Sequence, residues 1–112
     1  MKDKLKIIIA ADSSIAIHSL KDIPDVIGQC FGAEGLLITE AELSEDFFDL
    51  RTGIAGDLFQ KCTNYHLKLA VVIKDFATYG ERFSELVYEH RTHRAIRFFS
   101  SELEARVWLF AI

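Results

Sequence analysis

The chain has 112 residues, half of which are hydrophobic, and a formal net charge of −4 at pH 7. A chain of this length and apolar content fills one core, so a single domain over residues 1–112 is predicted. The acidic balance gives no long-range attraction to nucleic acid or to anionic lipid, since both attract basic faces. Nucleic-acid and membrane partners are therefore not expected.

The cysteines and the N-terminal residues indicate where the protein is found. Cys30 and Cys62 form no CxxC pair and lie in apolar helical patterns, so they are interpreted as buried residues in a reducing compartment. The apolar run Ile7–Ala11 is too short for a signal-peptide core and ends at Asp12. No run approaches the roughly 18 residues of a membrane span. These features predict a cytoplasmic protein.

The first third of the chain predicts two strands, a helix and a third strand. Leu5–Ala10 and Ile15–His18 are apolar runs separated by a polar turn, which favours a β-hairpin. Apolar residues from Ile23 to Phe31 then have the i, i+3, i+4, i+7 spacing of one helical face. Asp22 is the expected N-cap of this helix. Leu36–Thr39 is a short apolar run and is predicted to be a buried strand.

The rest of the chain continues the alternation of helices and strands. An apolar pattern wider than one stripe predicts a long, deeply buried helix over residues 44–65, with Ser44 as N-cap. The run Leu69–Ile73 is rich in β-branched residues and predicts the central strand. A helix over residues 79–90 and a strand over residues 95–99 follow. Ser101, with glutamate three residues later, is a capping box that begins the last helix.

The predicted fold is a single α/β domain with the order β-β-α-β-α-β-α-β-α. Strand-helix-strand units with short connections favour parallel pairing and right-handed crossovers. We therefore expect a mixed, mostly parallel sheet in which the hairpin supplies an antiparallel edge. The helices are expected mainly on one face of that sheet.

A long run in the predicted second helix, with shorter matches on both sides, carries a family resemblance. The matching residues are Phe47–Gly56, Gln60, Lys61, Asn64, Tyr65 and Lys68–Ala70, supported by Ser19, Asp22, Asp25, Asp75, Phe76, Tyr88 and Glu89. In this pattern the chain resembles the bacterial domain-of-unknown-function family 4180 over nearly its whole length. It departs after Glu89, where His90–Arg94 stands in place of a small polar turn. The family implies no established activity.

The order of strands and helices also resembles the STAS domain of anti-sigma-factor antagonists and sulfate transporters. In that fold a phosphorylatable serine or threonine precedes a glycine at the start of the second helix, and Thr52-Gly53-Ile54-Ala55 has this form. The resemblance implies a regulatory, protein-binding module with Thr52 as its switch. The apolar pattern begins earlier, however, and would place Thr52 inside a helix. Ser44, at the expected helix start, is the other candidate switch.

Gly53 and Gly56 lie inside the predicted second helix, where each costs about 1 kcal/mol relative to alanine. Their backbone could approach a phosphate or a partner. Alternatively, they could allow the helix to pack closely on the sheet. We favour close packing, since small residues inside such a helix usually serve contact.

Polar side chains follow the predicted parallel strands and form a candidate ligand or partner surface. Glu40, Lys74 and Asp75 stand at strand ends, where open α/β sheets collect ligands. They are equally explained as solvated caps and turn residues. Asp49 and Arg51 on the second helix extend this surface, but ion pairing explains them without any acid/base chemistry.

His90, Arg91, His93 and Arg94 form a basic corner after the third helix. Two histidines without a third ligand are a weak metal signal, so no metal site is predicted. The corner is better explained as a basic helix end, which could also take an anion or an acidic partner.

The C-terminal segment Val107–Ile112 is almost entirely apolar, and its side chains cannot all face the core of one domain. The remainder is a candidate self-association surface, and we expect a homodimer.

No nucleophile, metal or acid/base set can be assembled, so a cofactor-free, non-enzymatic function is favoured. The leading hypothesis is a regulatory protein-interaction module switched at Thr52 or Ser44. The alternative is a domain that binds a small polar ligand or an anion at the carboxyl ends of the strands.

Overall fold

The computed structural model describes residues 5–111. These residues form a four-stranded sheet, five α-helices and four 3₁₀ turns. The strands are β1 (Ile7–Ile9), β2 (Gly35–Thr39), β3 (Lys68–Val72) and β4 (Ile96–Phe99). The α-helices are α1 (Asp22–Gln29), α2 (Glu45–Phe48), α3 (Ile54–Asn64), α4 (Glu81–Glu89) and α5 (Glu102–Phe110). The 3₁₀ turns are η1 (Ala10–Ser13), η2 (Glu40–Glu42), η3 (Leu50–Thr52) and η4 (Phe76–Tyr79).

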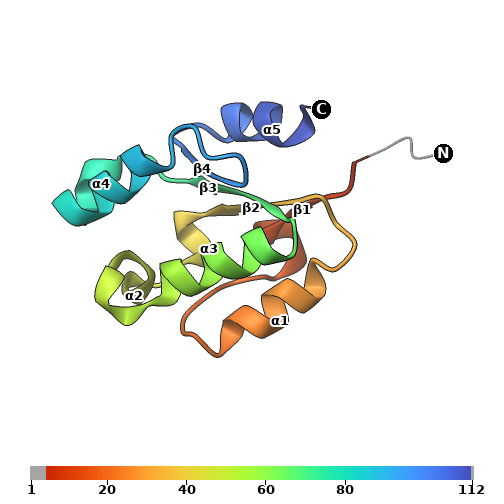
Figure 1. Ribbon diagram of the computed structural model, residues 1–112, viewed down its shortest axis with the longest axis horizontal. Coiled ribbons are helices and arrows are strands. Elements are labelled where there is room, and N and C mark those ends of the chain that lie inside the picture. The colour runs from red at the N-terminus through yellow and green to blue at the C-terminus, as the bar shows by residue number, and fades with distance from the viewer. Residues whose placement is uncertain (1–4, 112) are drawn as a thin grey trace.

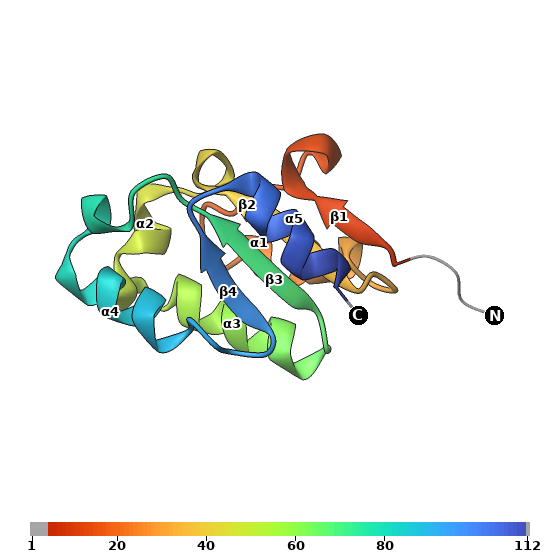
Figure 2. The ribbon, with the colours of Figure 1, turned by 90° about the horizontal axis from the view of Figure 1, so that it is seen from above.

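The sheet is entirely parallel, with strand order β1-β2-β3-β4. Each strand therefore pairs with the next one along the chain, and right-handed crossovers place the connecting helices on the same face. Figure 1 shows α1 and α3 on one side of the sheet and α5 on the other. Seen from above, α5 lies over the sheet between β1 and β3 and runs roughly along the strands (Figure 2). None of the described helices is long and apolar enough to cross a membrane.

The main core lies between the sheet and the helices that follow the first three strands. Strand side chains alternate between faces, so Leu36, Ile38, Leu69 and Val71 point into this core, where Phe47 of α2 is also fully buried. The two cysteines belong to the same cluster and are free thiols. Burial raises the pKa of one thiol to about 11 and of the other to about 12, so neither is reactive at neutral pH. Their predicted role as buried apolar residues is confirmed.

The predicted N-terminal hairpin is wrong. After β1 the chain turns through η1, and Ser14 adopts a left-handed conformation with φ of 57°. Ile15 and Ile17 are buried alternately, as in a strand, but Ile17 makes only one isolated parallel bridge, to Leu43. The segment fills the core beneath η2 without pairing with β1. The sheet is therefore not mixed.

The predicted long helix over residues 44–65 is also wrong, because it is broken into α2, η3 and α3. The Asp49 side chain accepts a hydrogen bond from the backbone N–H of Arg51 at 3.1 Å and begins η3. Gly53 then has φ of +80°, a left-handed conformation that disfavours any residue with a Cβ, and forms the N-cap of α3. Thr52 consequently lies just before a helix and not inside one.

The glycines do not serve close packing, contrary to our expectation. A Cβ added to Gly53 or to Gly56 would meet no heavy atom within 4 Å. Gly53 is required by its backbone conformation. Nothing in the structure explains a glycine at position 56, which is exposed on α3.

The expected helix starts are partly confirmed. The Ser101 hydroxyl accepts a hydrogen bond from the Glu104 backbone N–H at 3.3 Å, which is the serine half of the predicted capping box. Asp22 is not the N-cap of α1 but its first residue, and its carboxylate accepts from the backbone N–H groups of His18 and Ser19, at 2.8 and 3.3 Å. It thereby fixes the entry of the chain into the helix.

Candidate functional site

A wide groove lies between α2 with η3 on one side and the start of α4 on the other. It is lined by Glu45, Phe48–Arg51 and Tyr79–Phe83 and has a cavity volume of about 940 Å³. We call it the α2–α4 groove. Both of its walls follow strands of the sheet, and in Figure 1 they lie together at one end of the molecule. The groove thus occupies the end of the sheet where open α/β folds collect ligands.

Aromatic rings join the two walls of the groove. Phe48 and Tyr79 are stacked, with ring centroids 3.7 Å apart and planes 8° from parallel. Phe83 meets both rings edge to face, at 5.2 and 5.8 Å. Such contacts add to the stabilisation from apolar burial. The position of α2 is therefore coupled to that of α4 through this cluster.

Glu40 connects the ends of two strands to one wall of the groove. Its carboxylate accepts a hydrogen bond from the backbone N–H of Lys74 at 2.9 Å and another from the Tyr79 hydroxyl. These two donors lower the pKa of Glu40, and the carboxylate in turn raises the pKa of Tyr79 to about 12. Near neutral pH, Glu40 is charged and Tyr79 is a neutral donor.

The structure brings only part of the predicted strand-end surface together. Glu40 contacts the backbone of Lys74, whereas the Asp75 carboxylate accepts from the backbone N–H of Ala77 at 3.0 Å and begins η4. These are the turn and cap roles that polar loop residues commonly have. Tyr79 was not among the predicted site residues, because it was interpreted as the start of a helix, whereas it ends η4.

Asp49 and Arg51 form a two-point ion pair on the rim of the groove. The guanidinium donates to the two carboxylate oxygens at 3.0 and 2.9 Å. This pairing lowers the pKa of Asp49 and raises the pKa of Arg51. Because the Arg51 side chain is 88% exposed, the pair adds little to stability and its guanidinium is accessible to another anion.

Thr52 lies between η3 and α3 and is half-buried. Its hydroxyl oxygen is 2.7 Å from the carbonyl oxygen of Asp46 and 2.8 Å from that of Asp49, so it can donate to either. The same oxygen accepts from the backbone N–H of Ile54 at 3.3 Å. Through these hydrogen bonds the hydroxyl connects α2 and η3 to the first turn of α3.

Ser44, the other candidate switch, has a different environment. It precedes the four-residue helix α2 but makes no side-chain cap, and its hydroxyl donates to the carbonyl of His18 at 3.2 Å. It thus stabilises the irregular segment beside the bridge at Ile17 and takes no part in the α2–α4 groove.

The basic corner contains two histidines with separate structural roles. His93 Nδ1 accepts from the backbone N–H groups of Ala95 and Ile96, both at 3.0 Å, while His90 Nδ1 lies 2.8 Å from the Leu86 carbonyl. Burial, followed by the charges of His90 and nearby arginines, lowers the pKa of His93. Among residues 5–111 no group of three potential ligands could hold a metal.

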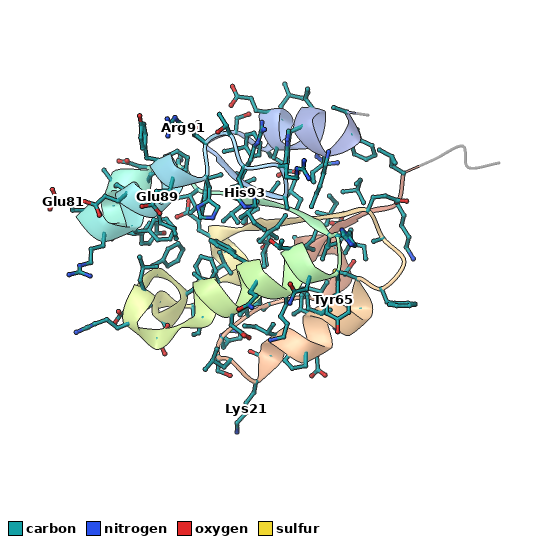
Figure 3. The ribbon with its side chains drawn as sticks, viewed as in Figure 1. Lys21, Tyr65, Glu81, Glu89, Arg91 and His93 are labelled. Atoms are coloured by element: carbon teal, nitrogen blue, oxygen red, sulfur yellow. The ribbon has the colours of Figure 1, made fainter. Side chains whose placement is uncertain are left out.

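Both arginines of the corner, Arg91 and Arg94, lie in the loop between α4 and β4. Arg91 covers the ring of Tyr88, with 3.7 Å between the guanidinium carbon and the ring centroid, and donates to the Tyr88 carbonyl at 2.8 Å. Arg91 and His93 point in different directions in Figure 3. Arg94 is exposed. The rings of His90 and His93 lie near each other, with centroids 5.0 Å apart, but the other contacts of the corner go separately to the backbone and to the ring of Tyr88.

Comparison with known proteins gives a family and no activity. No curated protein and no solved structure matches the chain. A family model described as "Domain of unknown function (DUF4180)" matches residues 2–109, nearly the whole length. The chain therefore belongs to the DUF4180 family.

Proposed function

We propose that this domain is a non-enzymatic, cytoplasmic regulatory module of STAS-like fold that binds a partner protein and is switched by phosphorylation of Thr52. The observation that supports this most directly is the break at Gly53, which leaves Thr52 beside the first turn of an 11-residue helix. A succession of strand-helix units in a parallel sheet is compatible with that fold. Two free, buried thiols are compatible with a reducing compartment.

Phosphorylation would reverse the hydrogen-bonding character of Thr52. A kinase would transfer the terminal phosphoryl group of ATP to the hydroxyl oxygen, releasing ADP, and its general base would take the hydroxyl proton. The phosphothreonine then offers only acceptors, with about −1.5 to −2 charges at pH 7. It can no longer donate to the carbonyls of Asp46 and Asp49, and the carboxylates of these two residues would repel it.

The new charge has favourable partners on the other side of the break. The first N–H groups of α3 and the positive end of its dipole favour an anion beside Thr52. The exposed Arg51 guanidinium could leave Asp49 and bind the phosphate. We infer that α2 and η3 would shift relative to α3. Because they form one wall of the α2–α4 groove, the modification would change the surface that a partner contacts.

Intact-mass analysis of the chain isolated from its native host, with fragmentation to locate the modification, tests the switch. We expect one phosphoryl group on Thr52 under at least one growth condition. Thr52→Ala should abolish it, whereas Ser44→Ala, which removes another half-buried hydroxyl near α2, should not. Modification of Ser44 alone would assign the switch to the other candidate. A chain that is unmodified under every growth condition would contradict the proposal.

The volume of the α2–α4 groove supports a second candidate function, the binding of a small polar ligand or anion. Its rim carries both acids and the guanidiniums of Arg51 and Arg82. A ligand at 100 times its dissociation constant stabilises a protein by about 2.7 kcal/mol, which a thermal-shift screen detects. Nucleotides, inorganic phosphate and common metabolites are the probes. A hit that Arg82→Gln abolishes would favour this function, and no shift with any probe would count against it.

A further inference from the structure

Two cationic side chains lie against one aromatic ring on the α5 face of the sheet. The Lys68 ammonium is 5.1 Å and the Arg97 guanidinium carbon 5.2 Å from the centroid of the Trp108 ring. Both distances are those of cation–π contacts. We call these three side chains the Trp108 cluster. Trp108 packs under α5, whereas the rings of the α2–α4 groove belong to the main core, so the cluster is independent of the proposed function.

The register of the sheet brings the two cations together. Strand side chains alternate between faces, so Lys68 points to the same face as Ala70, which belongs to the buried cluster beneath α5. Arg97 of β4 pairs with Ala70 in the parallel ladder. Lys68 and Arg97 are therefore diagonal neighbours on adjacent strands. Because α5 lies over the sheet between β1 and β3, β4 stays beside the helix and not under it (Figure 2).

The ring and the guanidinium are both held in place. Trp108 is half-buried and packs on Phe99, with ring centroids 5.7 Å apart. The Arg97 Nε donates a hydrogen bond to the carbonyl of His93 at 2.6 Å. Within residues 5–111 the two terminal nitrogens of this guanidinium make no hydrogen bond. The cluster therefore presents ordered donors, and a ligand that binds them loses little affinity to side-chain ordering.

The positive charge of the cluster is not compensated by the described part of the chain. No ion pair of residues 5–111 involves Lys68 or Arg97, so no carboxylate of this range lies within 4.0 Å of either cation. Two neighbouring cations repel each other. The positive field extends to His93, whose pKa is lowered first by burial and then by nearby charges that include Arg97. An anion placed between the two cations would relieve this repulsion.

We propose that the Trp108 cluster binds the phosphate group of a phosphate monoester, carried either by a soluble metabolite or by a lipid headgroup. A phosphate monoester has about −1.5 to −2 charges at pH 7, which matches two uncompensated cations. A carboxylate would neutralise only one of them. The planar guanidinium of Arg97 and the point charge of Lys68 are both common phosphate donors. The indole holds the two cations without neutralising them.

The emission of Trp108 tests the site directly, because the sequence contains one tryptophan. Titration with inorganic phosphate at neutral pH and constant ionic strength should change this emission saturably. We expect a dissociation constant of about 1 mM, the affinity that a few charge-assisted hydrogen bonds supply. Chloride and acetate at the same ionic strength should give no saturable change. Isothermal titration calorimetry repeats the measurement without depending on the indole.

Substitution of the two cations locates the bound phosphate. Lys68→Gln and Arg97→Gln should each weaken binding about tenfold or more, since each removes a charged donor. Arg97→Lys keeps the charge but not the planar fork, so its loss should be smaller. Lys21→Gln is the matched control, because it changes the net charge equally but lies on the side of the molecule away from α5 (Figure 3). Circular dichroism verifies that the variants are folded.

Co-sedimentation with vesicles distinguishes the two sources of the phosphate. Vesicles of phosphatidylcholine with phosphatidic acid, whose headgroup is a phosphate monoester, are compared with vesicles of phosphatidylcholine alone. Binding to the first kind only, lost in Arg97→Gln, would assign a lipid headgroup. A response to inorganic phosphate without co-sedimentation would assign a soluble ligand. The absence of both responses, or losses in Lys21→Gln equal to those in Lys68→Gln and Arg97→Gln, would overturn the site.

Discussion

The two faces of the sheet are built from the same strands but carry very different amounts of apolar packing. On the face of α1, α3 and α4, large side chains of alternate strand positions join the aromatic residues of α2 and α4 in one extensive core. On the α5 face, the buried cluster consists of Leu37, Ala70, Ala105 and Leu109. The alternation of strand side chains thus concentrates the stability of the domain on one face.

On the thin face, α5 lies close to the sheet at Gly35. Ala70 is small, and a Cβ added to Gly35 would lie 2.8 Å from Leu109 Cδ2 and 3.1 Å from Ile7 Cδ1. Small residues on β2 and β3 therefore let α5 approach the sheet closely with few large side chains between them. Leu109 and the half-buried Trp108 of α5 pack on this face, while Leu103, Val107 and Phe110 stay exposed on the other side of the helix. The difference between the faces teaches that one face supplies most of the apolar packing of the domain, whereas the other leaves apolar side chains of α5 exposed.

The strongest test of this comparison is Phe47→Ala. Phe47 is fully buried on the thick face and contacts the rings of Phe48, Phe59 and Phe83. Its removal should lower the free energy of unfolding by about 3–5 kcal/mol, the usual cost of a large cavity. Urea denaturation followed by circular dichroism measures this. Leu103→Ala, on the exposed stripe, should change the value for the monomer by less than about 0.5 kcal/mol.

Leu109→Ala measures the thin face directly. Leu109 is fully buried, but its cluster is small and adjoins partly buried residues that can move into the space. We expect a loss of about 2–3 kcal/mol in the free energy of unfolding, near the lower limit for a buried leucine. The same urea titration gives the result. A loss equal to or above that of Phe47→Ala would contradict the asymmetry between the faces.

Alanine substitutions at Gly53 and Gly56 compare the break between η3 and α3 with the regular helix that follows it on the thick face. Gly53→Ala forces a Cβ into a left-handed conformation and should destabilise the domain by about 1 kcal/mol. Gly56→Ala, in the exposed interior of α3 with open space around it, should stabilise by up to about 1 kcal/mol. Thermal melts of both variants give opposite shifts. Destabilisation by Gly56→Ala would reveal a contact that the monomer does not contain.

The fold could be predicted from the sequence wherever the pattern of buried residues also determines which backbone groups pair. Periodicity identified α1 and α4, short apolar runs identified β2 and β3, and the capping pattern at Ser101 identified α5. It also identified Ile15 and Ile17 as buried, but burial does not say which backbone a residue pairs with. A polar turn between two apolar runs is compatible with a hairpin and equally with the 3₁₀ turn observed.

The break between α2 and α3 was missed for a similar reason. The apolar pattern continues through it, because η3 keeps Leu50 against the core. The signal that was present is the glycine at position 53, where we favoured packing over backbone conformation. The α2–α4 groove could be predicted from neither the apolar pattern nor the glycine. The stack of Phe48 on Tyr79 and the hydrogen bond from Tyr79 to Glu40 join residues that are 31 and 39 positions apart. Only the folded chain specifies such pairs.

The smallest expected effect concerns that bond, which supports the groove on the thick face. Tyr79→Phe keeps the ring stack on Phe48 and removes the hydroxyl that donates to Glu40. Near neutral pH it should cost about 0.5–1 kcal/mol in the free energy of unfolding, the net value of one partly exposed hydrogen bond. Because the pKa of Glu40 in the folded chain lies below its usual 4.5, the folded state binds fewer protons than the unfolded state. This stabilisation is therefore complete above pH 4.5 and is lost as the pH falls further.

At alkaline pH the change of the free energy of unfolding with pH depends on Tyr79, whose pKa is raised from 10 to about 12. Its contribution is present below pH 10 and declines as the pH rises towards 12. Urea titrations of wild type and Tyr79→Phe at several pH values should therefore differ most between about pH 5 and 9 and converge at both extremes. A difference that does not change with pH would mean that the hydroxyl acts through packing and not through its bond to the Glu40 carboxylate. Glu40→Gln, which removes the charge from the same pair, should lose the acid-side change and so identify the titrating group.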